Sequence, residues 1–197
     1  MTHSAFDSDQ LKQKLSDLPS SKQGAFGASC CLRLVPNYVF FRQQTGWRDE
    51  KELVDALSLI WDWVEGGEVG DLHEAAERCE ALAPRSEDFE THLSTAAQDA
   101  CFAVCAVLDF ISGGGRDTER IVQAASYARD SVDLFVQEEE DMGSTDPELE
   151  QKILHHPLMQ AELAAQEFDL AELGRTDDLS SFRRRCQSTA KSNLRLP

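Results

Sequence analysis

An aspartate on an apolar helix is the residue in this sequence with the clearest capacity for chemistry. Asp99 lies in the stretch from Ala97 to Ile111, which is apolar over most of a helical circumference. On a helical wheel it shares one narrow stripe with Thr95, Phe102, Ala106 and Asp109. Burial perturbs the pKa of a carboxylate, and perturbed carboxylates in pockets are typical of functional sites.

Three upstream residues are the predicted partners of this carboxylate. Arg33, Asn37 and Tyr38 surround Pro36 and carry a guanidinium, an amide and a phenol. A buried charge needs a partner, so we favour an Asp99 that anchors packing by accepting hydrogen bonds from these groups. Two other interpretations stay open: an exposed acid, or a pocket in which these residues bind a small ligand.

The cysteines and histidines form no recognisable metal or redox motif. Cys30 and Cys31 are adjacent and diverge on a helix, whereas Cys101 and Cys105 share an apolar face. Free cysteine is among the most buried residue types, so we interpret all six as reduced core thiols. Neither CxxC nor HExxH occurs. We therefore predict no metal ligand, no cofactor and no catalytic residue.

The glycine run Gly113–Gly115 precedes a predicted helix but does not match a phosphate loop. It follows a helix rather than a strand, lacks a Gly-Lys-Ser/Thr ending, and leads into Asp117, whose charge would repel phosphate. GxSxG and kinase signatures are also absent. A non-enzymatic protein is therefore favoured.

Aromatic residues gather near Pro36, and two tryptophans among them are candidate interaction residues. Most of this aromatic group is expected to lie in the core, although Trp47 and Trp63 could contribute to a ligand platform. Trp63 lies off the main apolar stripe of its predicted helix. We therefore predict that Trp63 is exposed at an interface.

The elements that must position these residues are all predicted to be helices. Periodicity, caps and turn residues indicate seven to nine helices and no strand. Pro36 is predicted to end one helix and open another, which ends at Gly46. Asp117 is predicted to cap the helix after the glycine run, and Asp177 is predicted to cap the last one. We expect an all-α, orthogonal multi-helix bundle, a single domain over residues 1–197 with a basic tail, 187–197, that frays.

A series of short motifs runs through nearly the whole chain. Cys30-Cys31 precedes Pro36-Asn37-Tyr38, which is followed by an aromatic residue. Three further landmarks come later in the chain: a helix that contains Trp61, the triplet Asp99-Ala100-Cys101, and the pair Ser192-Asn193. In this order and spacing they resemble the YjaG-type family of bacterial proteins, known as domain of unknown function 416. The resemblance implies a cytoplasmic, all-helical protein. It implies no catalytic residues, because none are known for that family.

The charge balance limits the classes of partner. The chain has 36 acidic and 19 basic residues and a formal net charge of −17. Proteins that bind nucleic acid or anionic membranes normally show a basic face, so we expect neither partner. The first residues lack a signal-peptide pattern, and no run of about 18 apolar residues occurs. We therefore expect a cytoplasmic protein that does not span a membrane.

These observations favour a non-enzymatic interaction or regulatory module whose acidic surface binds a basic protein. From Arg183 onward there are five basic residues and no acid. We expect this segment to pack on an acidic face of its own chain, or on a second copy in a homodimer. The alternative function is a small-ligand binder or enzyme with a pocket near Asp99, Asn37, Tyr38 and Arg33.

Overall fold

The chain folds into an all-α multi-helix bundle, as predicted. The computed structural model describes residues 8–89, 91, 93–143 and 146–196, and these contain nine α-helices and no strand. The α-helices are α1 (Ser8–Ser16), α2 (Ser20–Thr45), α3 (Lys51–Val64), α4 (Leu72–Glu80), α5 (Leu93–Ser112), α6 (Thr118–Glu139), α7 (Leu149–His155), α8 (Pro157–Leu173) and α9 (Leu179–Thr189), with a 3-10 turn, η1 (Ser86–Asp88).

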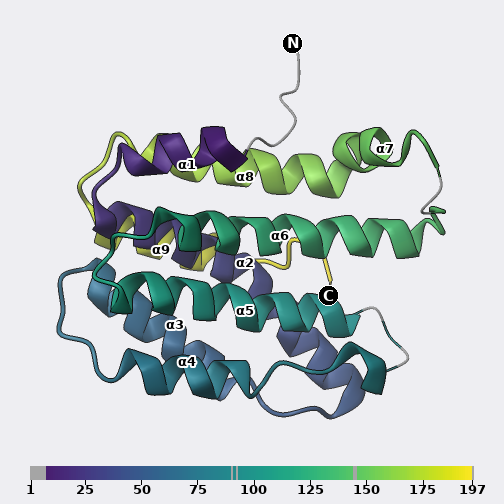
Figure 1. Cartoon of the computed structure of the whole chain (residues 1–197), viewed down its shortest axis with the longest axis horizontal. Coiled ribbons are helices and arrows are strands. Elements are labelled where there is room, and N and C mark those ends of the chain that lie inside the picture. The colour runs from purple at the N-terminus through teal and green to yellow at the C-terminus, as the bar shows by residue number, and fades with distance from the viewer. Residues whose placement is uncertain (1–7, 90, 92, 144–145, 197) are drawn as a thin grey trace.

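Helices α5 and α6 run side by side through the middle of the bundle (Figure 1). The long helix α2 crosses behind them and contacts both. Helices α3 and α4 pack on one side against α5, whereas α1 and α8 pack on the other side against α6. Helix α5 therefore has neighbours in most directions, which explains why its sequence is apolar over most of its circumference.

Helix α5 is long and apolar enough, by length and composition, to cross a membrane. It is the one such helix in the part of the chain that the structure describes, and 72% of its most apolar window is buried inside the bundle. A helix at the centre of a protein core passes the same test, so packing accounts for this composition.

Helix α2 continues through Pro36, so the predicted break at this residue is wrong. A proline inside a helix removes one hydrogen bond and crowds the carbonyl four residues earlier, here that of Leu32. Both halves of the helix are nevertheless packed, since Leu34 before the proline and Tyr38 after it are fully buried. That packing outweighs the local cost. Gly46 ends the helix, as predicted, with a φ of 72°.

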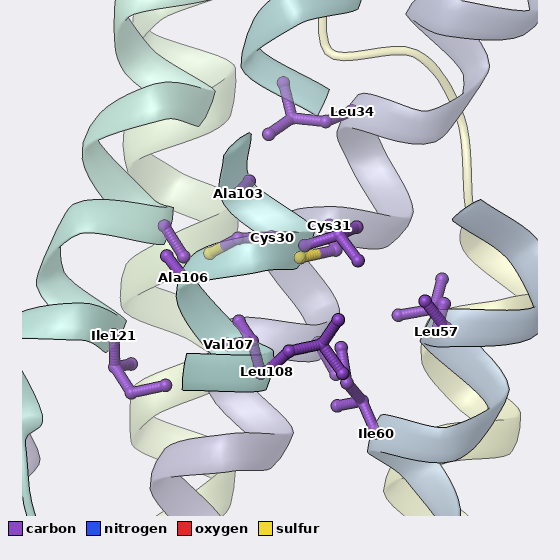
Figure 2. Packing of buried hydrophobic residues seen from close by; sticks show 14 of the residues in the cluster. Cys30, Cys31, Leu34, Leu57, Ile60, Ala103, Ala106, Val107, Leu108 and Ile121 are labelled. Atoms are coloured by element: carbon purple, nitrogen blue, oxygen red, sulfur yellow. The ribbon is translucent and has the colours of Figure 1, made fainter. Parts of the chain in front are cut away.

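Small residues let the central helices approach one another. A Cβ on Gly27 of α2 would lie 2.8 Å from Val107 Cγ2 and 3.0 Å from Ile121 Cδ1. Cys30 and Cys31 are fully buried beside them, with their sulfurs among apolar side chains (Figure 2). Burial raises the pKa of Cys30 to about 12. These two cysteines are therefore protonated core thiols, as predicted.

The caps of α6 and α9 follow the predicted chemistry, with a shift of one residue at α9. Asp117 caps α6, as predicted, and accepts a hydrogen bond from a main-chain N–H of the first turn. The cap of α9 is Asp178, which accepts from Ser181 N at 2.9 Å. The predicted cap, Asp177, instead pairs with Lys22 Nζ at 2.8 Å. Asp177 and Asp178 are both suitable N-cap residues by sequence, and only the path of the backbone decides which of them caps α9.

Candidate functional site

Asp99 is buried on α5 and has a different partner from those predicted. Its exposed fraction is 7%, and Ser131 Oγ on α6 donates a hydrogen bond to its Oδ2 over 2.7 Å. Burial raises the pKa of this carboxyl from its usual value near 3.8 to about 7, although the hydrogen bond opposes the shift. The predicted bonds from Arg33, Asn37 or Tyr38 are wrong, because these side chains are engaged elsewhere.

Arg33 lies in a buried ion-pair network that joins α2 to α8. Its Nη2 is 3.0 Å from Glu162 Oε1, and its Nη1 is 2.9 Å from Asp169 Oδ2. The two acidic side chains are 0% and 2% exposed. Ser29 Oγ donates to Asp169 at 2.8 Å, and Gln166 Nε2 donates to Glu162 at 2.9 Å. These extra hydrogen bonds are what a buried ion pair requires.

Every N–H of the Arg33 guanidinium has an acceptor. Nε donates to Glu162, Nη1 donates to the Ser29 carbonyl and to Asp169, and Nη2 donates to Glu162 and to Cys30 Sγ. A guanidinium has five such donors, so none remains for a ligand. Burial would lower the pKa of Arg33, but the surrounding negative groups raise it well above its usual value. The arginine is therefore a charged clamp between helices.

Arg185 of α9 extends this network to the C-terminal helix. Its Nη2 lies 2.7 Å from Asp169 Oδ1 and 2.7 Å from Glu172 Oε2. Its guanidinium carbon lies 4.7 Å from the centre of the Phe182 ring and 5.2 Å from that of Phe168. A cavity of about 250 Å³ opens beside these groups. This basic segment therefore packs on acids of its own chain, the first of the two arrangements that we predicted.

Asn37 fastens the C-terminal segment to α2. Its Nδ2 donates to Asn193 Oδ1 at 2.9 Å, and its Oδ1 accepts from Ser192 Oγ at 2.7 Å. Ser192, Asn193 and the following leucine are buried. The fraying predicted for 187–197 is therefore wrong around Asn193, because paired amides and an apolar side chain hold the backbone. Pro197 lies outside the described residues.

Tyr38 and Trp47 secure loops rather than a pocket with Asp99. The buried Tyr38 hydroxyl donates to the Arg48 carbonyl over 3.0 Å. Half-buried Trp47 donates from Nε1 to the Leu82 carbonyl over 2.9 Å, and its ring meets that of Phe89 edge-on at 5.3 Å. Both side chains thus hold the segments that follow α2 and α4 against the core.

Trp63 packs in the bundle, so the prediction of an exposed interface residue is wrong. Its ring meets Phe110 edge-on at 6.0 Å. It also fills the space that two glycines leave, since Cβ atoms on Gly24 and Gly115 would lie 2.8 and 3.3 Å from it. A helix held between several neighbours buries more than its main stripe. Among the described residues, the exposed large apolar side chains are Val54, Leu134 and Phe168.

A groove of about 260 Å³ lies over α5, between α4 and α6. Part of the predicted Asp99 stripe forms its floor, namely Phe102, Ala106 and Asp109. Asp99 itself lies one helical turn before Phe102. The hollow exists because the small side chains Ala106 and Cys105 stand where larger ones would fill the space between the flanking helices.

The lining of this groove is acidic. Glu77 and Glu80 come from α4 and Asp109 comes from α5, whereas Arg120 of α6 is the one arginine or lysine in the lining. With His73 neutral, the lining therefore carries a formal charge of −2. Arg120 Nη1 lies 3.8 Å from Asp109 Oδ2, so the positive charge of Arg120 offsets the negative charge of Asp109 at the α5–α6 end of the groove. The α4 side keeps its negative charge.

Two aromatic rings line the same groove. Phe102 and Tyr127 lie 5.9 Å apart with their planes at 44°. Gln123 Nε2 donates to the Tyr127 hydroxyl over 3.3 Å, and burial raises the pKa of this phenol, so it stays neutral. The faces of aromatic rings attract cations. Carboxylates and rings together therefore suit a cationic group.

Sequence reasoning found only part of this groove. It identified the α5 stripe but not Glu77, Glu80 and Tyr127, which lie on other helices. Glu77 and Glu80 are three apart and therefore share a helix face, which is the one signal available in the sequence. Among the residues that the structure describes, no group of three or more His, Cys, Asp or Glu side chains is arranged to hold a metal ion.

Residues 10–196 match the family described as "Protein of unknown function (DUF416)". The chain belongs to the DUF416 family. It is 34% identical over 93 residues to "Uncharacterized protein YjaG" of Escherichia coli K12, across 46% of this chain and 47% of that protein. It is 24% identical over 131 residues to an uncharacterized protein of Haemophilus influenzae, across 66% of each chain. These matches thus span about half and about two thirds of the two relatives.

A crystal structure at 1.91 Å resolution of a DUF416 family protein from Shewanella baltica OS155 has the same fold. The TM-score is 0.84 with 23% sequence identity, over 93% of this chain and 96% of that one. The resemblance predicted from the motifs is therefore confirmed. Because the names of the family and of these relatives state no activity, the function has to be argued from the geometry.

Proposed function

We propose that this DUF416 protein is a non-enzymatic, cytoplasmic interaction module that binds a basic protein through the groove between α4, α5 and α6. One observation carries the proposal: in this groove a hollow, an excess of negative charge and two aromatic rings occur together. The proposal rests on complementarity, since a basic surface would gain both Coulomb attraction and contact with the rings.

The negative charge on the α4 wall is available to a partner. Glu77 and Glu80 are exposed. Glu77 Oε1 lies 3.5 Å from His73 Nε2, and no side-chain hydrogen bond or ion pair of Glu80 occurs among the described residues. The arginine of α4, Arg78, is occupied by Glu52 at 2.8 Å and Glu74 at 2.6 Å. The net charge of −17 adds a long-range field that speeds the approach of a basic protein.

The residues first considered for a ligand pocket support the non-enzymatic part of the proposal. Asp99 binds Ser131, Arg33 binds Glu162 and Asp169, and the amide of Asn37 binds the C-terminal segment. Each therefore has a separate packing role, and we do not propose a shared pocket for them.

Affinity capture with matched variants tests the proposal. Tagged wild-type protein, Glu77→Gln/Glu80→Gln, and the charge-matched control Glu68→Gln/Glu167→Gln are incubated with native lysate at about 50 and about 500 mM NaCl, because salt screens exposed charges. We expect a stoichiometric basic partner that wild type and control retain at low salt. High salt should release it, and the groove variant should lose it. A partner held equally by the groove variant, or no partner at all, contradicts the proposal.

A further inference from the structure

The groove between α4, α5 and α6 has the parts of an arginine pocket. Resting on the proposed function, we propose that it takes an arginine side chain of the partner protein. The guanidinium would stack on the rings of Phe102 and Tyr127 and pair with the carboxylates of Glu77 and Glu80.

The chain already holds one of its own arginines in such surroundings. Arg185 lies over the rings of Phe168 and Phe182 at 5.2 and 4.7 Å. The same guanidinium lies 2.7 Å from a carboxylate oxygen of Asp169 and 2.7 Å from one of Glu172. Two rings and two carboxylates thus surround this guanidinium, with both carboxylates at its Nη2.

A second arginine of α9 repeats the arrangement. Arg183 lies 5.9 Å from the centre of the Trp61 ring, 2.7 Å from Glu65 Oε2 and 3.6 Å from Asp62 Oδ1. One or two rings and two carboxylates therefore hold both arginines of α9, whereas Arg33 of α2 is held, among the described residues, by two carboxylates without a ring. The α4 side of the groove offers the same set, and Arg120 is held at the opposite end by Asp109.

The aromatic rings of the groove favour arginine over lysine. The groove has a volume of about 260 Å³, which leaves space for one long side chain. A guanidinium is planar, stacks on rings, pairs with carboxylates through two parallel bonds and loses its hydration more easily than an ammonium. Rings contribute more to binding a guanidinium than to binding a compact, strongly hydrated ammonium.

Two peptides of equal charge test the assignment on the full-length protein. Acetylated hexa-arginine amide and hexa-lysine amide are titrated calorimetrically, with backbone NMR shifts recorded in parallel. We expect the arginine peptide to bind about fivefold or more tightly, with shifts centred on Glu80, Phe102 and Tyr127. Phe102→Leu/Tyr127→Leu should remove the difference between the peptides, whereas Phe40→Leu, a half-buried ring outside the groove, should preserve it.

The outcomes separate this inference from the proposed function. Equal affinities, or shifts spread evenly over the acidic surface, overturn the arginine pocket but leave a salt-sensitive basic partner standing. If the double aromatic variant unfolds, Glu77→Gln/Glu80→Gln serves instead and should weaken the arginine peptide more than Glu68→Gln/Glu167→Gln does. An equal effect of the two charge-matched pairs also overturns the pocket. Failure of both the peptides and the lysate capture removes both proposals.

Discussion

Asp99 is buried without a neighbouring cation among the described residues, and this burial determines the pKa of its carboxyl group. Its carboxylate accepts a hydrogen bond from the neutral hydroxyl of Ser131, and burial raises its pKa to about 7. In the unfolded chain an aspartate titrates near 3.9. Between these two values the folded chain holds the proton more tightly than the unfolded chain. The carboxyl therefore favours folding at low pH, and this contribution is lost as the pH rises through about 4 to 7.

The first prediction is that Asp99→Asn removes this part of the pH dependence. Asparagine can still accept from Ser131 and carries no charge. The difference in free energy of unfolding, variant minus wild type, should increase by on the order of a few kcal/mol between pH 4 and pH 8. Urea unfolding at several pH values measures the difference. Asp109→Asn, an exposed acid on the same helix, is the control and should keep the wild-type slope.

A loss of stability in Asp99→Asn at pH 8 would contradict this account. Such a loss is what a carboxylate paired with Arg33 would have produced, because removing one partner leaves the other charge buried. The sign of the change in stability of Asp99→Asn at pH 8 therefore distinguishes the observed hydroxyl partner, Ser131, from the predicted partner, Arg33.

Helices α5 and α8 attach to the bundle by different means. Helix α5 buries an apolar surface, whereas the buried stripe of α8 is mixed. At spacings of three and four it contains Met159, Glu162, Gln166, Asp169 and Leu173. The three polar side chains on that stripe form hydrogen bonds to α2, to α6 and within α8, although the buried Gln166 Oε1 has no hydrogen-bond partner among the described residues. Helix α8 therefore depends on Arg33 in a way that α5 does not.

The second prediction is that Arg33→Met destabilises the protein by about 3–5 kcal/mol, because buried Glu162 loses its cation and Asp169 keeps only Arg185. Chemical denaturation measures the effect. Arg33→Met combined with Glu162→Gln should recover part of the loss, since Glu162 is then uncharged and Asp169 stays paired with Arg185. Lys51→Met removes an exposed ion pair with Asp55 and should leave stability nearly unchanged. An equally small effect of Arg33→Met would exclude the clamp.

The whole molecule is strongly acidic, with a formal charge of −17. Like charges repel in the compact state more than in the expanded unfolded chain, so the charge that attracts a basic partner also destabilises the fold. Binding of a basic partner would relieve part of this repulsion. The single-domain organisation and self-association through the C-terminal helix stay predictions at this scale.

The third prediction is that moderate salt stabilises the free protein. The melting temperature should rise between about 20 and about 200 mM NaCl, because the screening length shortens over this range. Calorimetry measures it. Glu68→Lys/Glu167→Lys lowers the magnitude of the net charge from 17 to 13 and should show a smaller rise. A melting temperature that falls with salt would show that attractive ion pairs outweigh the net repulsion.

Local patterns were enough to predict the all-α class, most helix ends and the core position of α5. Caps such as Asp117 and stops such as Gly46 act through backbone groups within a turn of themselves, so their effect can be read from a few residues. The order of motifs was also sufficient to indicate the DUF416 family. These properties depend on short stretches of sequence.

Contacts between distant segments decided the rest. Pro36 remains inside a helix because both flanking halves pack, and Trp63 is partly buried because two distant glycines leave space for it. Asp99 meets Ser131, and the groove assembles from three helices, at positions that no local period specifies. Periodicity determines which face of a helix is apolar, but only packing in three dimensions determines which residue from another helix meets that face.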